Sequence, residues 1–234
     1  MIKILKETED WIAIDKPAGL LVHRTKLAAE EKELFALQML RDQIGQAVYP
    51  VHRLDRPTSG ILLFSKKKEL LPLFKAEFSE RKVKKTYLAL VRGIPSSEKG
   101  SFDRALTNER SGRLQEARTD YQIVSTVEIP FDTTGRYPTS RYSLLSLSPF
   151  TGRTHQIRRH LAQARHYILG DKKHGDNKQN KFFEKQFGLQ NLLLHASELE
   201  FQDPVIQQKI VIRAEIPVHF RTILTELGIP SQEV

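Results

Sequence analysis

Short runs of apolar and β-branched residues recur along this chain and constrain its fold more than any helical pattern does. They predict strands over residues 2–5, 11–15, 48–54, 61–66, 83–91, 119–129, 141–148, 192–201 and 209–214. Apolar residues at helical spacing predict helices over residues 28–44, 68–81, 154–165 and 218–227. Because these helices do not alternate strictly with the strands, we expect an α+β fold with a mixed, mainly antiparallel sheet and flanking helices and loops.

Two stretches lack a clear period and are expected to be irregular. Residues 94–118 are polar and rich in turn residues, which favours a hairpin or an excursion that reaches a partner. Residues 170–190 are charged and punctuated by glycine, which predicts a loop with room for one helical turn.

The chain has 234 residues and shows no repeat or linker that requires a division, so we expect a single domain over residues 1–234. Its N-terminus lacks the apolar stretch of a signal peptide, and no apolar run approaches the ~20 residues of a membrane span. We therefore expect a cytoplasmic protein, and a monomer. The absence of cysteine excludes disulfides, thiol catalysis and cysteine-based zinc sites.

The charge balance of the chain indicates a partner rich in phosphate. Lysine and arginine number 37 against 28 aspartate and glutamate residues, a net charge of +9, and the pI is near 9.7. Basic residues cluster at 66–68, 81–85, 153–159 and 172–173. Solvated surface lysines would explain any one cluster, but a basic domain with several of them favours nucleic acid.

Residues 53–56, Arg-Leu-Asp-Arg, place one carboxylate between two guanidiniums, and the turn sequence Pro-Thr-Ser-Gly follows. Nearby positive charge favours the ionised form of a carboxylate. An anion held on a turn beside a predicted strand is a candidate nucleophile or base, and Asp55 is that candidate here. A surface cluster of salt bridges is the structural alternative.

A second group of candidate residues lies at 151–160, Thr-Gly-Arg-Thr-His-Gln-Ile-Arg-Arg-His, where a helix is predicted to begin. On such a helix Arg158 could point inward to hold Asp55. Arg153, Arg159 and the amides of the first helical turn could bind phosphates. A basic helix in solvent is the structural alternative.

Other site classes find little support in the sequence. The histidines at 52, 155, 160, 166, 174 and 195 are scattered and show no recognised metal-ligand spacing, so we expect no metal. Gly170 and Gly175 have the separation of a phosphate-binding loop, but Asp176 stands where that loop requires lysine. No dinucleotide-binding glycine pattern is present either, so we expect no nucleotide cofactor.

Five motifs, in order along nearly the whole chain, resemble those of the RluA family of pseudouridine synthases. They are Lys-Pro-Ala-Gly at 16–19, His-Arg-Leu-Asp at 52–55 with Thr-Ser-Gly at 58–60, the tyrosine motif at 85–93, the arginine motif at 152–158 and Leu-His-Ala at 194–196. The resemblance implies an enzyme that isomerises uridine in RNA without a cofactor. Only about fifty residues precede the catalytic strand, so we expect no S4-like RNA-binding domain of the kind found upstream in many relatives. RNA affinity is then expected from the basic surface of the catalytic domain.

The resemblance also implies roles for individual residues. Asp55 is the essential carboxylate, either as a nucleophile or as a base. Tyr87 stacks on the uracil, and Arg158 orients the carboxylate. Arg53 fills the space left by a flipped base and Leu194 forms an apolar wall. The full set expected to bind substrate or RNA is Arg53, Arg56, Arg153, His155, Gln156, Arg159 and Leu194.

Stretches that flank the motifs narrow the expected substrate. The stretches at 41–46, at 135–139 with 141–142, and at 158–162 with 170–171 and 174–176 resemble those of family members that modify uridine 65 of tRNA. Ribosomal RNA is the alternative substrate within the family. A non-catalytic RNA-binding protein and a metal-dependent phosphodiesterase are the alternatives from other functional classes.

Overall fold

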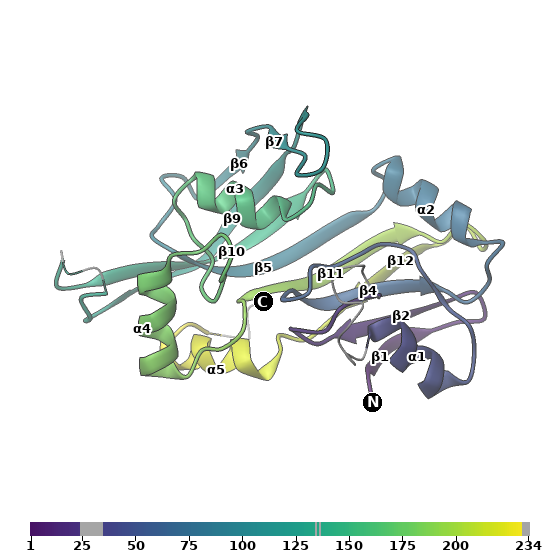
Figure 1. The fold of residues 1–234 in the computed structure, drawn as a ribbon, viewed down its shortest axis with the longest axis horizontal. Helices are drawn as coiled ribbons and strands as arrows, with labels where there is room; N and C mark the ends of the chain where they lie inside the picture. The colour runs from purple at the N-terminus through teal and green to yellow at the C-terminus, as the bar shows by residue number, and fades with distance from the viewer. Residues whose placement is uncertain (24–34, 134, 136, 231–234) are drawn as a thin grey trace. The chain divides into compact units, whose positions relative to one another are not determined.

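The structure is a computed structural model that describes residues 1–23, 35–133, 135 and 137–230. It divides into two compact units, which we describe separately (Figure 1). The first unit comprises Met1–Lys85 and Ala196–Glu215, and the second comprises Thr86–His195 and Ile216–Val234. The chain passes between the units at three points, which lie within β5, within β11 and between Glu215 and Ile216.

The first unit is built on strands that lie in the order β1, β2, β4 and β11. Their bounds are Lys3–Glu7, Trp11–Lys16, Ser59–Ser65 and Leu194–Gln202. β3 (Tyr49–Pro50) pairs with β4, and β12 (Lys209–Arg213) pairs with β11. The unit also contains α1 (Ala36–Ile44) and α2 (Leu71–Ser79).

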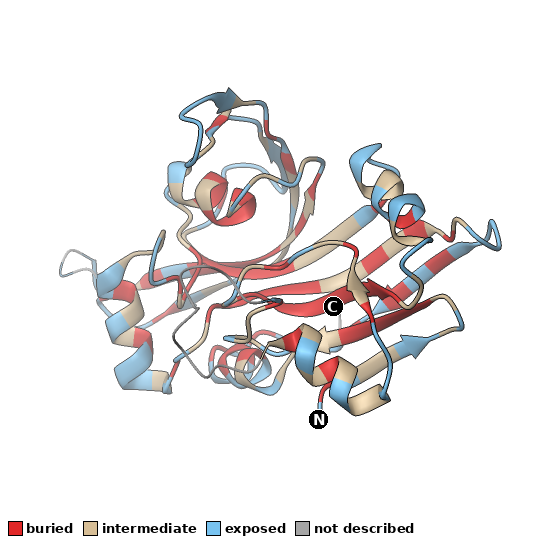
Figure 2. Cartoon of the chain, turned by 45° about the vertical axis from the view of Figure 1, so that its right-hand side comes forward, coloured by how far each residue is buried: buried red, intermediate tan, exposed pale blue. Residues whose placement is uncertain are grey.

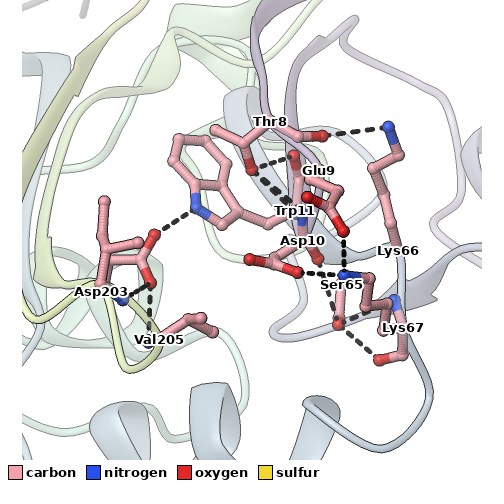
Figure 3. Close-up of polar contacts among 10 residues, drawn as sticks. Thr8, Glu9, Asp10, Trp11, Ser65, Lys66, Lys67, Asp203 and Val205 are labelled. Atoms are coloured by element: carbon pink, nitrogen blue, oxygen red, sulfur yellow. Dashed lines mark hydrogen bonds and ion pairs between the residues drawn. The ribbon is translucent and has the colours of Figure 1, made fainter.

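Aromatic side chains form the centre of the first unit's core. Trp11 is fully buried and packs edge-on against Phe201, with 5.5 Å between ring centroids. Burial of an indole requires a partner for its N–H, and Trp11 Nε1 donates a hydrogen bond to Asp203 Oδ2 at 2.6 Å (Figure 3). This bond ties the start of β2 to the segment between β11 and β12.

The second unit is an antiparallel arrangement of β5, β10, β9 and β6. Their bounds are Lys84–Arg92, Ser140–Pro149, Thr119–Ile129 and Lys99–Phe102. β7 (Leu106–Thr107) and β8 (Leu114–Gln115) form a short hairpin. The helices are α3 (Gln156–Gln163), α4 (Asn177–Phe187) and α5 (Val218–Glu226).

Helices cover both faces of the sheet in the second unit. Leu90 and Leu144 belong to a core cluster with residues of α4 and α5, whereas Ala89 and Leu145 belong to a cluster with residues of α3. Since neighbouring residues of a strand point to opposite faces, α4 and α5 cover one face and α3 covers the other (Figure 1). Figure 2 shows the resulting distribution of burial, with buried residues along the strands and exposed residues on the outer sides of the helices.

The predicted fold class is confirmed, with a mainly antiparallel sheet and flanking helices. Most predicted strands and the helices at 68–81, 154–165 and 218–227 also form, with ends shifted by a few residues. The hairpin expected within 94–118 is the β7–β8 pair. The helix predicted at 28–44 is observed as α1 from Ala36, and its residues before 35 lie outside the described residues. The single domain over 1–234 stays a prediction.

The strand predicted at 48–54 is wrong beyond its start, because β3 ends at Pro50. The His52 side chain supplies the reason. Its Nε2 accepts a hydrogen bond from the backbone N–H of Leu63 at 3.1 Å, which a continuing strand would have used for its own backbone. Residues 51–58 are therefore a loop, and Asp55 lies on it.

The loop predicted at 170–190 is also wrong, because the eleven-residue helix α4 lies within it. The Asp176 side chain caps its start by accepting hydrogen bonds from the N–H groups of Lys178 and Gln179, and Gly188 ends it in the left-handed conformation. Most side chains of the helix are polar, and of its two buried residues, Gln179 and Phe183, only Phe183 is apolar, so the helix shows no apolar period.

Gly60, at the start of β4, is a position where a side chain would not fit. Its φ is +108°, and a Cβ there would lie 2.2 Å from the carbonyl oxygen of Ala196. We expect Gly60→Ala to lower the free energy of unfolding by about 2–5 kcal/mol, through backbone strain and overpacking together. Gly19→Ala is the control, because its φ is +85° but a Cβ would meet nothing within 4 Å. Chemical denaturation that gave equal losses for both variants would contradict this account.

Candidate active site

The loop that carries Asp55 is held in the first unit by the segment around residue 19. The backbone N–H of Gly19 donates to the carbonyl oxygen of Arg56 at 2.9 Å, and Arg56 Nε donates to the carbonyl oxygen of Gly19 at 3.1 Å. The N–H of Thr58 donates to the backbone oxygen of Asp55 at 3.1 Å, which closes the turn. Asp55 is half-buried, whereas Arg53 and Arg56 are exposed. The structure therefore presents two guanidiniums to solvent beside a partly shielded carboxylate.

Lys16 lies directly beneath this loop and is fully buried. Its Nζ donates to the carbonyl oxygens of Pro17 at 2.9 Å, Leu20 at 2.8 Å and Arg56 at 3.1 Å. Burial lowers the pKa of Lys16 to about 7, although the charges of Asp55 and Asp15 act to raise it. The hydrogen bonds of the ammonium group therefore link the 16–20 segment to the Asp55 loop.

Arg158 lies on α3 in the second unit, and its observed ion-pair partner within that unit is Asp171. Arg158 Nε donates to Asp171 Oδ2 and Arg158 Nη2 donates to Asp171 Oδ1, both at 2.8 Å. The two side chains are 5% and 1% exposed. The inward orientation predicted for Arg158 is thus observed, and the expectation that it holds Asp55 stays a prediction.

The residues before α3 form a tight turn. His155 adopts the left-handed conformation with φ 54°, and its Nδ1 lies 2.9 Å from Nε2 of His174. Gln156 is buried, with its Oε1 accepting from the N–H of Arg153 at 3.0 Å and its Nε2 donating to the carbonyl oxygen of Arg118 at 3.0 Å. The side chain of Gln156 therefore shapes the turn, and its expected role in RNA binding stays a prediction.

Tyr87 and Leu194 contribute to the same core cluster of the second unit, next to Ile157 of α3. Tyr87 is half-buried and Leu194 is buried. Arg153 and Arg159 flank the start of α3 and are both partly exposed, and Arg153 Nε donates to the carbonyl oxygen of Glu116 at 3.1 Å. The second unit thus gathers Tyr87, Leu194 and the arginine motif around α3.

Sequence reasoning placed Lys16 and Asp171 in stretches that resemble the family but assigned a role to neither residue. A lysine at the end of an otherwise apolar strand, directly before Pro17, was the available signal for the first. For Asp171 the signal was a lone carboxylate that follows the apolar residues Ile168 and Leu169. Neither sequence feature predicts which groups the side chain contacts in the folded protein.

The described residues contain no group of three or more histidine, aspartate or glutamate side chains placed to hold a metal ion. Within the same residues no helix is long and apolar enough to cross a membrane.

The fold matches that of solved pseudouridylate synthases. The structure titled human RNA pseudouridylate synthase domain containing 4 superposes with a TM-score of 0.74 at 24% identity, and covers 97% of this chain and 93% of its own. Human RNA pseudouridylate synthase domain containing 1 gives a TM-score of 0.72 at 22% identity, over 92% of this chain and 83% of its own.

Residues 10–163 match the family model described as RNA pseudouridylate synthase. The chain belongs to this family, and the resemblance to its RluA branch is confirmed.

Relatives with a more specific name align over almost the whole length. The tRNA pseudouridine synthase C of Vibrio vulnificus (strain CMCP6) is 44% identical over 99% of this chain and 97% of its own. The protein of the same name from Pasteurella multocida (strain Pm70) is 45% identical over 92% of this chain and 91% of its own.

The buried Lys16 makes the stability of the first unit depend on pH. Its pKa falls from 10.5 in the unfolded chain to about 7 in the folded protein. Between these values the unfolded chain binds more protons, so stability rises with pH across that window. We expect the unfolding free energy of the wild-type protein to rise from pH 7 to pH 10 relative to that of Lys16→Met.

Denaturation of both proteins at a series of pH values measures this difference. Lys68→Met is the matched control, because Lys68 is exposed in the folded protein, and its difference from wild type should stay constant. A constant difference for Lys16→Met as well would refute the account of its burial.

Proposed function

We propose that this chain converts uridine to pseudouridine in tRNA, at uridine 65. The observation that carries the proposal is the alignment, at 44% identity and over nearly the full length of both chains, with a relative named tRNA pseudouridine synthase C. Family membership supplies the reaction, and the name of the relatives supports the choice of tRNA as its substrate. Since tRNA is the proposed partner, we also propose a cytoplasmic location.

The reaction detaches uracil from its ribose, rotates the base and rejoins it through carbon. It needs neither a redox partner nor an energy donor, which agrees with the lack of nucleotide-binding motifs in the sequence. Asp55 is the proposed reactive carboxylate, as nucleophile or base. Both roles require the ionised form of this carboxylate.

The remaining proposed roles follow from the motifs. A uridine in a base-paired stem has to be flipped out of the stack, at a cost of a few kcal/mol. Arg53 is proposed to fill the vacated space, and Tyr87 to stack on the flipped uracil. Leu194 is proposed as an apolar wall of the pocket, and Arg158 as a catalytic residue that supports the carboxylate.

Phosphate contacts are proposed for Arg56, Arg153 and Arg159, with His155 and Gln156 at the same RNA surface. Their partial or full exposure, except for the buried Gln156, allows side-chain contact with a backbone. RNA affinity would then come from the charge of this domain itself.

Asp55→Asn tests the chemistry directly. We expect no detectable pseudouridine from this variant, with tRNA affinity close to that of the wild-type protein, because the substitution removes the charge of one side chain and preserves its size. A tritium-release assay on labelled tRNA transcript measures turnover, and filter binding measures affinity.

Asp42→Asn is the matched control, since Asp42 is an exposed carboxylate on α1 outside the proposed site. It should retain full turnover. Turnover by Asp55→Asn would refute the assignment of Asp55. A wild-type protein that modified ribosomal RNA and left a tRNA transcript unmodified would refute the substrate, as would full activity on a transcript with cytidine at position 65.

Salt dependence tests the phosphate contacts. Each phosphate that a cation neutralises releases counterions, so the logarithm of affinity falls with the logarithm of salt concentration by about 0.7–0.9 per contact. We expect Arg159→Ala to reduce this slope by about 1. Lys185→Ala, at an exposed position of α4, is the control and should leave the slope unchanged. Titrations that gave both variants the wild-type slope would count against Arg159 as a phosphate contact.

A further inference from the structure

The guanidinium of Arg158 is held along one edge by Asp171. The two carboxylate oxygens accept hydrogen bonds from Nε and Nη2, each at 2.8 Å, which is the side-on, bidentate geometry of an arginine–carboxylate pair. A planar group held at two nitrogens cannot rotate in its plane. The direction of the remaining nitrogen, Nη1, is therefore determined by Asp171.

Asp171 is itself held in place by the backbone around it. Its Oδ1 also accepts hydrogen bonds from the N–H groups of Lys173 at 3.0 Å and His174 at 2.9 Å. Its backbone oxygen accepts from the N–H of Gly175 at 3.0 Å and from Asn180 Nδ2 at 2.9 Å. A Cβ at residue 175 would lie 2.2 Å from that oxygen, so only glycine permits the turn to close this tightly. The loop thus leaves one position for the carboxylate.

The ionised form of Asp171 is favoured by the hydrogen bonds that the side chain accepts. Burial by itself would raise the pKa of the carboxyl, but the hydrogen bonds from Arg158, His174 and Lys173 lower the pKa below its ordinary value. Asp171 is therefore an anion at neutral pH and neutralises the buried guanidinium.

We propose that Asp171 is a positioning residue for pseudouridine formation, which sets the orientation of the Arg158 guanidinium. This inference rests on the proposed function, in which Arg158 is catalytic. Stability does not account for the pair, because replacing a buried ion pair by apolar residues of similar size is often neutral or stabilising. Orientation of a charged group is what the pair supplies and an apolar pair cannot.

Asp171→Asn breaks the clamp and keeps most of its surroundings. An amide oxygen at the Oδ1 position can still accept from the N–H groups of Lys173 and His174 and from Arg158 Nη2, but the amide nitrogen at the Oδ2 position cannot accept from Arg158 Nε, so the bidentate contact is lost. We expect the single-turnover rate at saturating enzyme to fall about 100-fold, as for misplacement of a catalytic group. We expect the affinity for a tRNA transcript to stay within about twofold.

Asp171→Asn in an Arg158→Lys background distinguishes a role in positioning Arg158 from an independent structural role of Asp171. Lysine cannot make the bidentate bond, so Asp171→Asn should there cost no more than about twofold in rate. An independent structural role would give the same fold loss in both backgrounds.

Asp171→Glu covers the case in which Asp171→Asn fails to fold. It keeps the negative charge that the buried guanidinium needs, but moves the carboxylate by one methylene group. We expect a folded protein by thermal unfolding, with unchanged affinity and a rate well below that of the wild type. Asp176→Asn is the matched control, since Asp176 caps α4 and pairs with Arg92 at 2.7 Å. It should keep its rate and lose at most the stabilisation from the ion pair with Arg92, because asparagine also caps helices.

Several results would overturn the inference. They are a wild-type rate in a folded Asp171→Asn or Asp171→Glu variant, equal fold losses in both Arg158 backgrounds, and a comparable loss of rate in Asp176→Asn. A wild-type protein that makes no pseudouridine in any RNA would overturn the proposed function and this inference together. An active wild type with a full rate in Arg158→Lys would overturn the inference and leave the reaction standing.

Discussion

Burial of a positive charge requires acceptors for its hydrogen bonds, and each of the two segments that carry the proposed site contains such a buried charge. Lys16 is buried beneath the Asp55 loop and satisfied by the carbonyl oxygens of Pro17, Leu20 and Arg56. Arg158 is buried in α3 and donates two hydrogen bonds to the carboxylate of Asp171. A buried cation without such partners would cost several kcal/mol. The backbone around each cation therefore has little freedom to move.

The same contacts hold in place the side chains that are proposed to take part in the reaction. A loop is the ordinary place for a reactive residue, and loops are mobile unless something holds them. Lys16 and the paired bonds between Gly19 and Arg56 hold the loop of Asp55. Residues of the 170–176 turn hold Asp171 and thereby Arg158. In each unit a neighbouring segment orients the side chain proposed for the reaction.

Much of the fold could be predicted because its signals are local. Strands such as Thr119–Ile129 and Lys209–Arg213 follow from apolar and β-branched runs, and the closing helix at 218–226 follows from its period. The errors arose where a side chain from elsewhere decides the outcome. The nitrogen of His52 ends β3 by taking the N–H of Leu63. Helix α4 forms in a stretch that is mostly polar, because Phe183 packs into a core supplied by other elements.

The sequence by itself determined the strand pattern, the basic charge, the lack of thiol chemistry and the five motifs that mark the family. These properties depend on residue type and on spacing along the chain. Only the tertiary structure decided that Lys16 lies under the Asp55 loop and that Asp171 clamps Arg158. The partner of a buried charge is whichever acceptor the packing brings within about 3 Å. For Lys16 one of these acceptors is the backbone oxygen of a residue 40 positions away, which no spacing rule identifies.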